Sequence, residues 1–592
     1  MRSEALAGYR GPASLAQVWR WGVEFVWRIE HAFERSKAAG HATDDTRIRI
    51  FVVLALFSMA FATLGVEAGR AALFSGADGV GLSEPVPAEA RADLTDRQGR
   101  LLATDLTHYG LYLDPREVWD RGETRRGLLA ALPNLSKDRL ERALRSGRRE
   151  YLIGGLTPQE RARVHDLGLP GAVFEEEQRR VYPLGPTAAH LIGFSDSGGH
   201  GLAGAERALD ASVRQGARAG ETTTLSVDLR VQAALEDELA KGMAAYQALA
   251  AIGVVTDVHT GEILGMTSLP DFDPNAPGGA DPNRMVNRAA QSVFEMGSTF
   301  KVFTTAMALD AGVVNIRTTF DATAPLKIGD RSVHDFHAEN RTMTVEDIFL
   351  HSSNIGTAKM GLMAGADRLT SYFKAFGLME PAKVELAESA KPILPRRWNA
   401  DTVASASFGH AISVSPLAVA AATGAIMNGG AYVPLTIAKR DPGVRPAGRR
   451  VVSEETSRLM LELMRANVLK GSGGKADAMG LRVGGKTGSA EKVIGGRYVR
   501  DRLVSSFSAV FPTDGRLEDP RYLVLIIYDE PKGTKETWGF RTGGWNAAPT
   551  AGRVIDRIAP FLGVPRTRAT PFAPVPSLAA SPIADLPSGG EL

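Results

Sequence analysis

Cysteine is absent from all 592 residues of the chain. Its absence excludes disulfide bridges, a thiolate nucleophile, iron–sulfur clusters and zinc sites built on cysteine. A strong excess of one charge is missing as well, because Lys and Arg total 69 against 67 for Asp and Glu, which leaves a formal net charge of +2. This balance gives no support for binding to nucleic acid.

The composition lacks the extremes of a disordered chain or a polytopic transporter. Hydrophobic residues make up 44% and charged residues 23%, which is typical of globular proteins. A chain of 592 residues is nevertheless too long for one core, and its length predicts about three to five domains.

One apolar run stands out, from Ile50 to Val66, and it carries no charged residue. A helix of this length reaches the lower limit for crossing a hydrocarbon core of about 30 Å. A buried core helix is one alternative. A cleaved signal peptide is another, but its A-x-A pattern, Ala60 and Ala62, lies inside the run. We interpret residues 47–67 as an uncleaved transmembrane helix.

Basic residues are distributed unequally around this helix. Many precede it, whereas Arg70 is the only one that closely follows it. This bias predicts that residues 1–46 lie in the cytoplasm and that the chain from residue 68 onward is exported. A tryptophan-rich segment of the cytoplasmic region fits a helix at the membrane interface or a loosely folded tail. The preceding basic residues are Arg2, Arg10, Arg20, Arg28, Arg35, Lys37, Arg47 and Arg49.

The exported part divides by its patterns. Residues 68–221 contain short helical patterns and glycine-rich loops without a catalytic constellation, and the turn Arg97–Gly99 predicts a hairpin. Residues 222–563 begin with a helical stripe and continue with strand-like runs, two of which are joined by His259–Gly261 as in a β-hairpin. We therefore expect an α/β (α+β) domain with a largely antiparallel sheet. Residues 564–592 are rich in proline and are expected to be disordered.

The candidate chemistry begins at Gly297–Lys301, the sequence G-S-T-F-K, directly before an apolar helical run. Ser298 is predicted to open this helix, and Lys301 lies one turn later on the same face. A lysine kept partly neutral can take the serine proton, and a helix N-terminus offers N–H groups to negative charge. The pattern S-x-x-K alone is weak, because it recurs at Ser472–Lys475 and Ser489–Lys492 and also fits a plain helix N-cap.

Two further motifs strengthen this interpretation. Ser352–Asn354 lies between two helical runs, where a short turn can aim a hydroxyl and an amide into a cleft. Lys486–Gly488 follows two glycines in a strand-like run, where glycine permits close backbone approach. The order S-x-x-K, S-x-N, K-T-G is that of penicillin-binding proteins and serine β-lactamases, in which the serine is acylated.

Further segments extend the resemblance beyond the three motifs. They are RADLTDRQGRLLA, RRVYPLGPTAAHLIGF, GLAGAE, TGEILGMTSLPDFDPN, NRAAQSVFEMGSTFK, SFGHAISVSPLAVAAA and TGGWNAAP. The sequence resembles the class B penicillin-binding proteins, and among them the septal, cell-division peptidoglycan transpeptidases. The resemblance implies a penicillin-binding transpeptidase or serine β-lactamase-like fold for 222–563, preceded by an elongated pedestal domain of the dimerisation type, 68–221.

The resemblance also implies the chemistry. Ser298 would attack the carbonyl of a D-alanyl-D-alanine stem peptide with Lys301 as its base, and an amine of a neighbouring stem would then take the acyl group. Backbone N–H groups of Ser298 and Ser489 would form the oxyanion hole. The implied catalytic residues are Ser298, Lys301, Ser352, Asn354 and Lys486, and the implied substrate-binding residues are Thr487, Gly488 and Ser489.

The sequence departs from the family pattern at four positions. Met296 replaces the usual proline before G-S-T-F-K, and Ala92 replaces the first glycine of R-G. Ala411 replaces the second glycine of G-x-G, which leaves the shape of that part of the cleft open. Ser489 stands where threonine is commoner.

Rival functions share parts of this pattern. A β-lactamase or a β-lactam sensor would have the same three motifs, but no base for a deacylating water is evident. A non-catalytic division scaffold is disfavoured by the intact motifs. An elongation-specific class B transpeptidase is the nearest alternative.

Partners and location follow from the resemblance alone. They are peptidoglycan stem peptides, β-lactam antibiotics and membrane proteins of the division complex, including a glycan-polymerising glycosyltransferase. The protein would be a single-pass protein of the inner membrane at the septum, with its catalytic domain in the periplasm. Acyl transfer needs no cofactor and no metal. The run His334–His337 lacks an evident third metal ligand and is interpreted as polar packing.

Overall fold

The computed structural model describes residues 90–329 and 331–567, together with Trp27, Arg28, His31, Arg35, Ala38, Val53 and Phe57. The predicted cytoplasmic region, transmembrane helix and C-terminal tail therefore lie outside the described residues, apart from these single positions and residues 564–567. Among the residues that are described, none of the helices combines the length and the apolar character needed to cross a membrane. The chain divides into two compact units, 1–84 and 85–592, and the second is described here.

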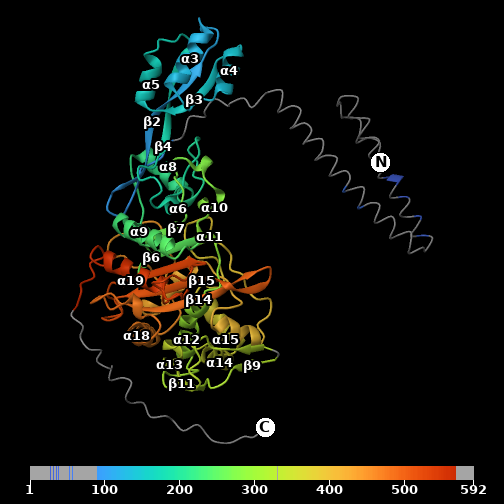
Figure 1. The fold of residues 1–592 in the computed structure, drawn as a ribbon, viewed down its shortest axis with the longest axis vertical. Coiled ribbons are helices and arrows are strands. Elements are labelled where there is room, and N and C mark those ends of the chain that lie inside the picture. Colours follow the sequence, from blue (N-terminus) through green and yellow to red (C-terminus); the bar gives the residue numbers. More distant parts are fainter. Residues whose placement is uncertain are drawn as a thin grey trace, which may run out of the picture. The chain divides into compact units, whose positions relative to one another are not determined.

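Two long paired strands organise residues 90–224 (Figure 1). Strand β2, Leu101–Leu113, pairs antiparallel with β4, Ala172–Val181, and at its C-terminal half with β3, Glu150–Leu156. The short β1, Leu94–Thr95, pairs antiparallel with the start of β2, which confirms the predicted hairpin. It also pairs in parallel with β5, Thr223–Thr224.

Helices cover this sheet, and their ends follow local sequence signals. At the start of α5, Thr157 Oγ1 accepts the N–H of Glu160 while the Glu160 carboxylate accepts the N–H of Thr157, and Pro158 occupies the first helical position. These contacts satisfy N–H groups that no helix can pair internally. The helices of this part are α3 (Arg121–Ala131), α4 (Lys137–Arg145), α5 (Pro158–His165), α6 (Ala189–Ile192), α7 (Gly204–Ala208) and α8 (Asp210–Ala219).

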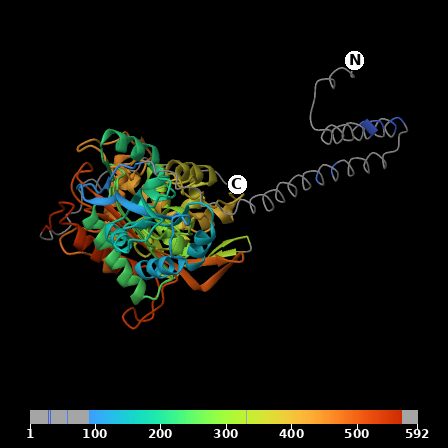
Figure 2. The ribbon, with the colours of Figure 1, turned by 90° about the horizontal axis from the view of Figure 1, so that it is seen from above.

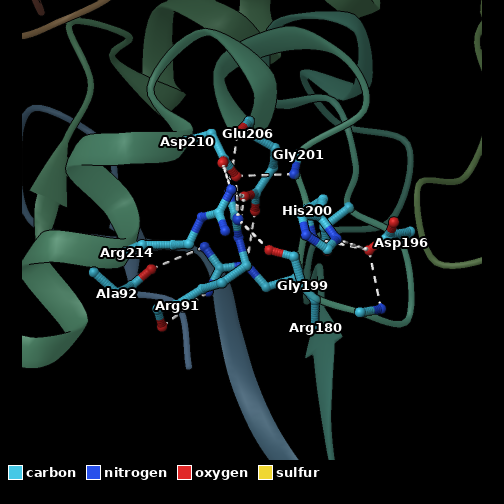
Figure 3. A network of polar contacts seen from close by, with 12 residues as sticks. Arg91, Ala92, Arg180, Asp196, Gly199, His200, Gly201, Glu206, Asp210 and Arg214 are labelled. Atoms are coloured by element: carbon cyan, nitrogen blue, oxygen red, sulfur yellow. Dashed lines mark hydrogen bonds and ion pairs between the residues drawn. The ribbon is translucent and has the colours of Figure 1, made fainter. Parts of the chain in front are cut away.

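A buried network of charged residues fastens the start of this part to its helices (Figure 3). Arg91 donates to Glu206 Oε2 at 2.5 and 2.9 Å and to Asp210 Oδ1 at 2.5 Å. Arg180, on β4, donates to Glu206 Oε1 at 2.7 Å and to the carbonyl of Ala92 at 2.9 Å. The side chains of Arg91 and Glu206 are 1% and 0% exposed. Because one carboxylate serves two guanidinium groups, removal of its charge would take an ion-pair partner from both buried cations, leaving Asp210 for Arg91 and Asp105 for Arg180.

The second sheet has the order β14-β15-β16-β6-β7, and every neighbouring pair is antiparallel. This confirms the predicted antiparallel α/β (α+β) domain and its hairpin at residues 259–261. The strands are β6 (Ala250–Asp257), β7 (Ile263–Leu269), β14 (Gly484–Ile494), β15 (Arg497–Phe511) and β16 (Tyr522–Asp529).

Both faces of this sheet are covered by helices (Figure 1, Figure 2). Helix α9, Leu229–Ala245, contains the predicted apolar stripe and packs with α19, Ala547–Ile558, on one face. Helices α12, Lys301–Asp310, and α17, Pro416–Met427, lie in the hydrophobic cluster of the other face. Successive side chains of a strand point to opposite faces, so the central strand β16, covered on both sides, is apolar from Leu523 to Ile527. On β16, residues 523, 525 and 527 join the α12–α17 cluster, and residues 524, 526 and 528 join the α9–α19 cluster.

Shorter elements connect and surround these layers. The helices are α10 (Pro282–Met285), α11 (Arg288–Gln291), α13 (Val345–Leu350), α14 (Asn354–Ala364), α15 (Ala366–Ala375), α16 (Ala400–Ser407) and α18 (Glu454–Lys470). The strands are β8 (Thr319–Asp321), β9 (Leu326–Ile328), β10 (Arg331–Val333), β11 (Thr342–Thr344), β12 (Ala431–Tyr432) and β13 (Arg449–Arg450). Single 3-10 turns lie at Pro277–Gly279, Gly297–Phe300 and Gly474–Ala476.

The charge network generates a stability prediction. Glu206→Gln keeps the side-chain volume but removes the charge that Arg91 and Arg180 share, so we expect the free energy of unfolding to fall by about 3 to 5 kcal/mol. Urea unfolding of the full-length chain, followed by circular dichroism, measures the change. Glu175→Gln is the control, because it removes only an exposed partner of Arg149 and should cost less than about 1 kcal/mol. Equal losses in the two variants would contradict the prediction.

Candidate active site

Ser298 lies in the 3-10 turn Gly297–Phe300, which runs directly into α12. The predicted helix start is therefore a tighter turn, and the Ser298 carbonyl accepts the N–H of Lys301. Gly297 adopts φ of 51°, and a Cβ there would lie 2.5 Å from the carbonyl oxygen of Ser489. Only glycine tolerates both the left-handed backbone and this contact. The turn that carries Ser298 consequently rests on β14, at the K-T-G motif.

Lys301 is fully buried on the first turn of α12. Its Nζ donates to Asn354 Oδ1 at 2.7 Å, to Ser352 Oγ at 3.1 Å and to the Ser352 carbonyl. Burial lowers the pKa of Lys301 well below its ordinary value, and the nearby charge of Lys486 lowers it further, while Asp335 partly opposes them. The lowered pKa favours the neutral amine, which can accept a proton.

Lys486 reaches the same hydroxyl from the opposite side. It is fully buried on β14, and its Nζ donates to Ser352 Oγ at 2.9 Å. Burial lowers the pKa of Lys486 to about 7. Ser352 is thus placed between two amines, and its backbone is held at φ of 58°, a left-handed conformation that costs free energy in a residue other than glycine.

The turn that carries Ser352 and Asn354 is held by residues that the motif does not include. Ser353 caps α14, and its Oγ donates to Asp335 Oδ2 at 2.8 Å, while Asp335 Oδ1 accepts the N–H of Ile355 at 2.9 Å. The Asn354 amide donates to the carbonyl of His334 at 2.9 Å. The run His334–His337 thus contributes polar packing to the site. In the sequence, only the position of this run before Ser352–Asn354 indicated a link to the site.

The hydroxyls of the K-T-G strand face neighbouring loops. Thr487 Oγ1 lies 2.7 Å from Ser472 Oγ, and Ser489 Oγ donates to the Gly488 carbonyl at 2.9 Å and accepts the N–H of Gly543 at 3.1 Å. A Cβ on Gly488 would lie 2.3 Å from Thr299 Oγ1, so glycine is required for the close fit of the Ser298 turn.

The structure therefore brings the three predicted motifs to one place. Lys301, Ser352, Asn354 and Lys486 are joined by hydrogen bonds, and the turn with Ser298 packs on the strand with Gly488 and Ser489. Sequence reasoning did not assign a role in the site to Asp335, Thr299 or Ser472. Ser472 belongs to one of the repeated S-x-x-K patterns, but its lysine, Lys475, lies over the Trp545 ring at 4.2 Å instead.

The run Gly480–Thr487 also matches the spacing G-x-x-x-x-G-K-[ST] of phosphate-binding loops. A phosphate-binding loop of that kind leads into a helix, whose N-terminus faces the phosphates. Here the run leads into strand β14, and the Lys486 amine is buried against Ser352. The local structure therefore does not form a nucleotide site.

Comparisons with known proteins agree with this geometry. Residues 86–222 match the penicillin-binding protein dimerisation domain, and residues 251–555 match the penicillin-binding protein transpeptidase domain. The chain is 57% identical over 564 residues to a probable peptidoglycan D,D-transpeptidase FtsI of Caulobacter vibrioides, covering 94% of this chain and 96% of that protein. It is 32% identical over 499 residues to peptidoglycan D,D-transpeptidase FtsI of Escherichia coli, covering 79% and 82%.

A solved structure shows the same fold. The crystal structure of penicillin-binding protein 3 from Mycobacterium tuberculosis, complexed with aztreonam, aligns with a TM-score of 0.62 at 24% identity. The alignment covers 82% of this chain and 99% of that one.

The low pKa of Lys486 generates a prediction on stability. A lysine in the unfolded chain has a pKa of about 10.4. Between about pH 7 and pH 10 the unfolded state therefore binds more protons than the folded state. The free energy of unfolding consequently rises with pH over that window. We expect Lys486→Met to raise the melting temperature by about 2 to 5 °C at pH 6 and the gain to shrink toward pH 9. Scanning calorimetry at several pH values measures the gain in melting temperature and its decrease with pH.

Lys492→Met, on the same strand, is the control for this experiment. Hydrogen bonds to Asp529 and Glu530, and the charges of these carboxylates, outweigh burial and raise the pKa of Lys492. Its replacement should lower the melting temperature across the neutral range. A Lys486→Met variant that behaved in the same way would contradict the low pKa of Lys486.

Proposed function

This chain belongs to the class B penicillin-binding proteins and is a peptidoglycan D,D-transpeptidase; we propose that Ser298 is the nucleophile, which the substrate acylates. The observation that carries the proposal is the pair of buried amines, Lys301 and Lys486, that share the Ser352 hydroxyl beside the Ser298 turn. Two amines with lowered pKa values at one hydroxyl form a proton relay, which acyl transfer from serine requires.

The first half-reaction uses Lys301 as base. Neutral Lys301 takes the hydroxyl proton of Ser298 as its oxygen attacks the carbonyl carbon between the two D-alanines. The C–N bond then breaks, and the terminal D-alanine leaves after its amine receives a proton through Ser352 and Lys486. In the second half-reaction the amine of a neighbouring stem peptide attacks the ester carbonyl and gives up a proton. The C–O bond to Ser298 breaks as the new amide bond forms, and Ser298 regains a proton.

Backbone donors stabilise the charge on the carbonyl oxygen. We assign this role to the N–H groups of Ser298 and Ser489, whose backbones are adjacent because Gly297 packs on the Ser489 carbonyl. One such donor contributes about 3 to 4 kcal/mol to transition-state binding.

The substrate-binding role goes to β14 and the turn opposite it. Strand β14 is at the edge of its sheet, so its outer side can pair with an extended stem peptide. Thr487, Gly488 and Ser489 would hold the peptide and its terminal carboxylate, and Asn354 would bind the donor peptide. A β-lactam enters the same position and acylates Ser298. Acyl transfer in this arrangement uses neither a metal nor a cofactor.

We assign the enzyme to septal synthesis during cell division, with the elongation-specific role as the alternative. The support is the 57% identity to a protein named FtsI. The same assignment includes residues 1–46 in the cytoplasm, a transmembrane helix at 47–67, a pedestal at 68–221, a periplasmic transpeptidase domain at 222–563 and a tail at 564–592. Its partners would be membrane proteins of the division complex, among them a glycan-polymerising glycosyltransferase.

Acylation of Ser298 can be measured directly. Incubation of the full-length protein in detergent with a labelled penicillin should give one persistent acyl adduct by intact-protein mass spectrometry, and Ser298→Ala should give none. Ser472→Ala, which alters the serine of a second S-x-x-K pattern, should retain the adduct. An adduct on Ser298→Ala, or rapid drug hydrolysis without an adduct, would refute the assignment.

The cellular role has its own test. Depletion of the protein in its native host should produce filaments without septa, because elongation continues when septal cross-linking stops. Microscopy with a fluorescent cell-wall label shows the outcome. Rounded or swollen cells with normal septa would assign the enzyme to elongation instead.

A further inference from the structure

Glu295, three residues before Ser298, accepts hydrogen bonds from two separate parts of the chain. Its Oε1 accepts the N–H of Ala411 at 2.9 Å and the hydroxyl of Tyr498 at 3.2 Å. Its Oε2 is buried and has no hydrogen-bond partner among the described residues. The roles proposed above for the three motifs do not use this carboxyl.

The contact with Ala411 acts on a strained loop. Ala411 adopts φ of 62°, the left-handed region, where a side chain costs about 1 to 2 kcal/mol relative to glycine. The sequence left the shape of this part of the cleft open, because alanine stands where the family pattern has glycine. The Glu295 carboxyl accepts the N–H of the strained residue itself, so it stabilises the conformation that alanine disfavours.

The same loop touches the backbone beside the nucleophile. The Gly409 carbonyl accepts the N–H of Gly297 at 3.2 Å, and a Cβ on Gly409 would lie 2.1 Å from the Gly297 carbonyl oxygen. A shift of the loop by a few tenths of an ångström therefore moves Gly297, and with it the turn that carries Ser298.

The contact with Tyr498 links this loop to the substrate-binding strand. Tyr498 lies on β15, where it pairs with Val493 of β14, the strand that carries the K-T-G motif. The Tyr498 ring also lies 5.5 Å from the ring of His410, the residue before Ala411. One carboxyl thus joins the nucleophile segment, the loop Phe408–Ala411 and the β14–β15 hairpin.

We propose that Glu295 is a positioning residue, which holds the Ser298 turn against the K-T-G strand and so sets the rate of acylation without touching the substrate. The inference rests on the proposed function of Ser298. A glycine at position 411 would adopt the left-handed conformation without strain. With alanine there, the Glu295 carboxyl supplies the stabilisation that the loop needs.

The ionisation state of Glu295 affects how firmly it holds the loop. Burial raises the pKa of Glu295 to about 7, against the opposing effect of its bonds from Ala411 and Tyr498. The carboxylate accepts hydrogen bonds about twice as strongly as the neutral acid. The loop is therefore held best above pH 7.

Other titratable groups face the same place. His410 has its pKa lowered to about 4 by burial and by Lys301, so it is neutral in this range. Burial and Glu295 raise the pKa of Tyr498, with Arg331 opposing. Lys486 also titrates near pH 7, so a pH profile of the wild type alone reports both groups. The ratio of two profiles removes the lysine contribution.

The experiment compares acylation of full-length variants by a labelled penicillin, with stopped-flow measurement of the acylation rate constant and of the drug's dissociation constant. Glu295→Gln keeps an acceptor of the same shape and cannot ionise. The ratio of the wild-type rate to the Glu295→Gln rate should rise from near 1 at pH 5.5 to about fivefold to tenfold at pH 8.5, with a midpoint near pH 7. The dissociation constant should change less than twofold.

Glu236 offers a matched control away from the cleft. Its Oε1 accepts the N–H of Ala188 at 2.7 Å, and Ala188 is also left-handed, at φ of 56°. Burial raises the pKa of Glu236 as well. Glu236→Gln therefore repeats the chemical change at a purely structural site, and its rate ratio should stay flat with pH.

Rescue by glycine separates positioning from general destabilisation. Glu295→Ala should lower the acylation rate constant about tenfold to a hundredfold, and adding Ala411→Gly should recover about fivefold to tenfold of that loss. If Glu295→Ala does not fold, the Glu295→Gln profile decides. A flat ratio for Glu295→Gln, or no recovery by Ala411→Gly, would overturn the proposal. Absence of acylation in the wild type would instead refute the function of Ser298.

Discussion

The burial of two lysines around one serine hydroxyl is the constraint on which the catalytic part of the structure depends. An ammonium group removed from water loses several kcal/mol of solvation. Here Lys301 and Lys486 are both 0% exposed, and within residues 90–329 and 331–567 no carboxylate hydrogen-bonds to either amine. The loss of solvation is met by a lowered pKa for each amine and by hydrogen bonds to neutral acceptors on Ser352 and Asn354. Three elements, α12, the turn before α14 and strand β14, must converge for these acceptors to be in place.

That convergence requires backbone conformations that ordinary residues avoid. Gly297, Ser352, Gly409 and Ala411 all have positive φ, and they surround the place where the three elements meet. Such conformations persist only when the surroundings over-determine them. The surroundings are closely packed here, because the sheet is buried on both faces and α12 is buried from Lys301 to Ala308. Packing on both faces of the sheet thus holds the strained backbone of the cleft in place.

Residues 90–224 use buried charge in the opposite way. Arg91, Arg180 and Glu206 carry unlike charges that neutralise one another through direct hydrogen bonds. In the catalytic region two amines approach the same oxygen, and burial together with the nearby charge of Lys486 lowers the pKa of Lys301. The first arrangement fastens Arg91 to helices α7 and α8. The second arrangement, with two buried lysines, keeps amines of lowered pKa beside the serine. It is tolerated because the rest of the domain is firmly packed.

The sequence by itself determined the fold class, the hairpins at residues 91–106 and 250–269, helix α9 and the residues of the three motifs. These features depend on local periodicity, turn residues and short patterns, which are readable along the chain. It did not reveal Asp335, Ser472 or Glu295, because each acts through a partner that folding brings near and that no spacing marks. The tertiary structure also decided the pKa values of Lys301 and Lys486, since burial and the distance between charges exist only after folding. Ala411 joins the two levels: the sequence marked it as a departure, and only its left-handed backbone and its contact with Glu295 explain how the departure is accommodated.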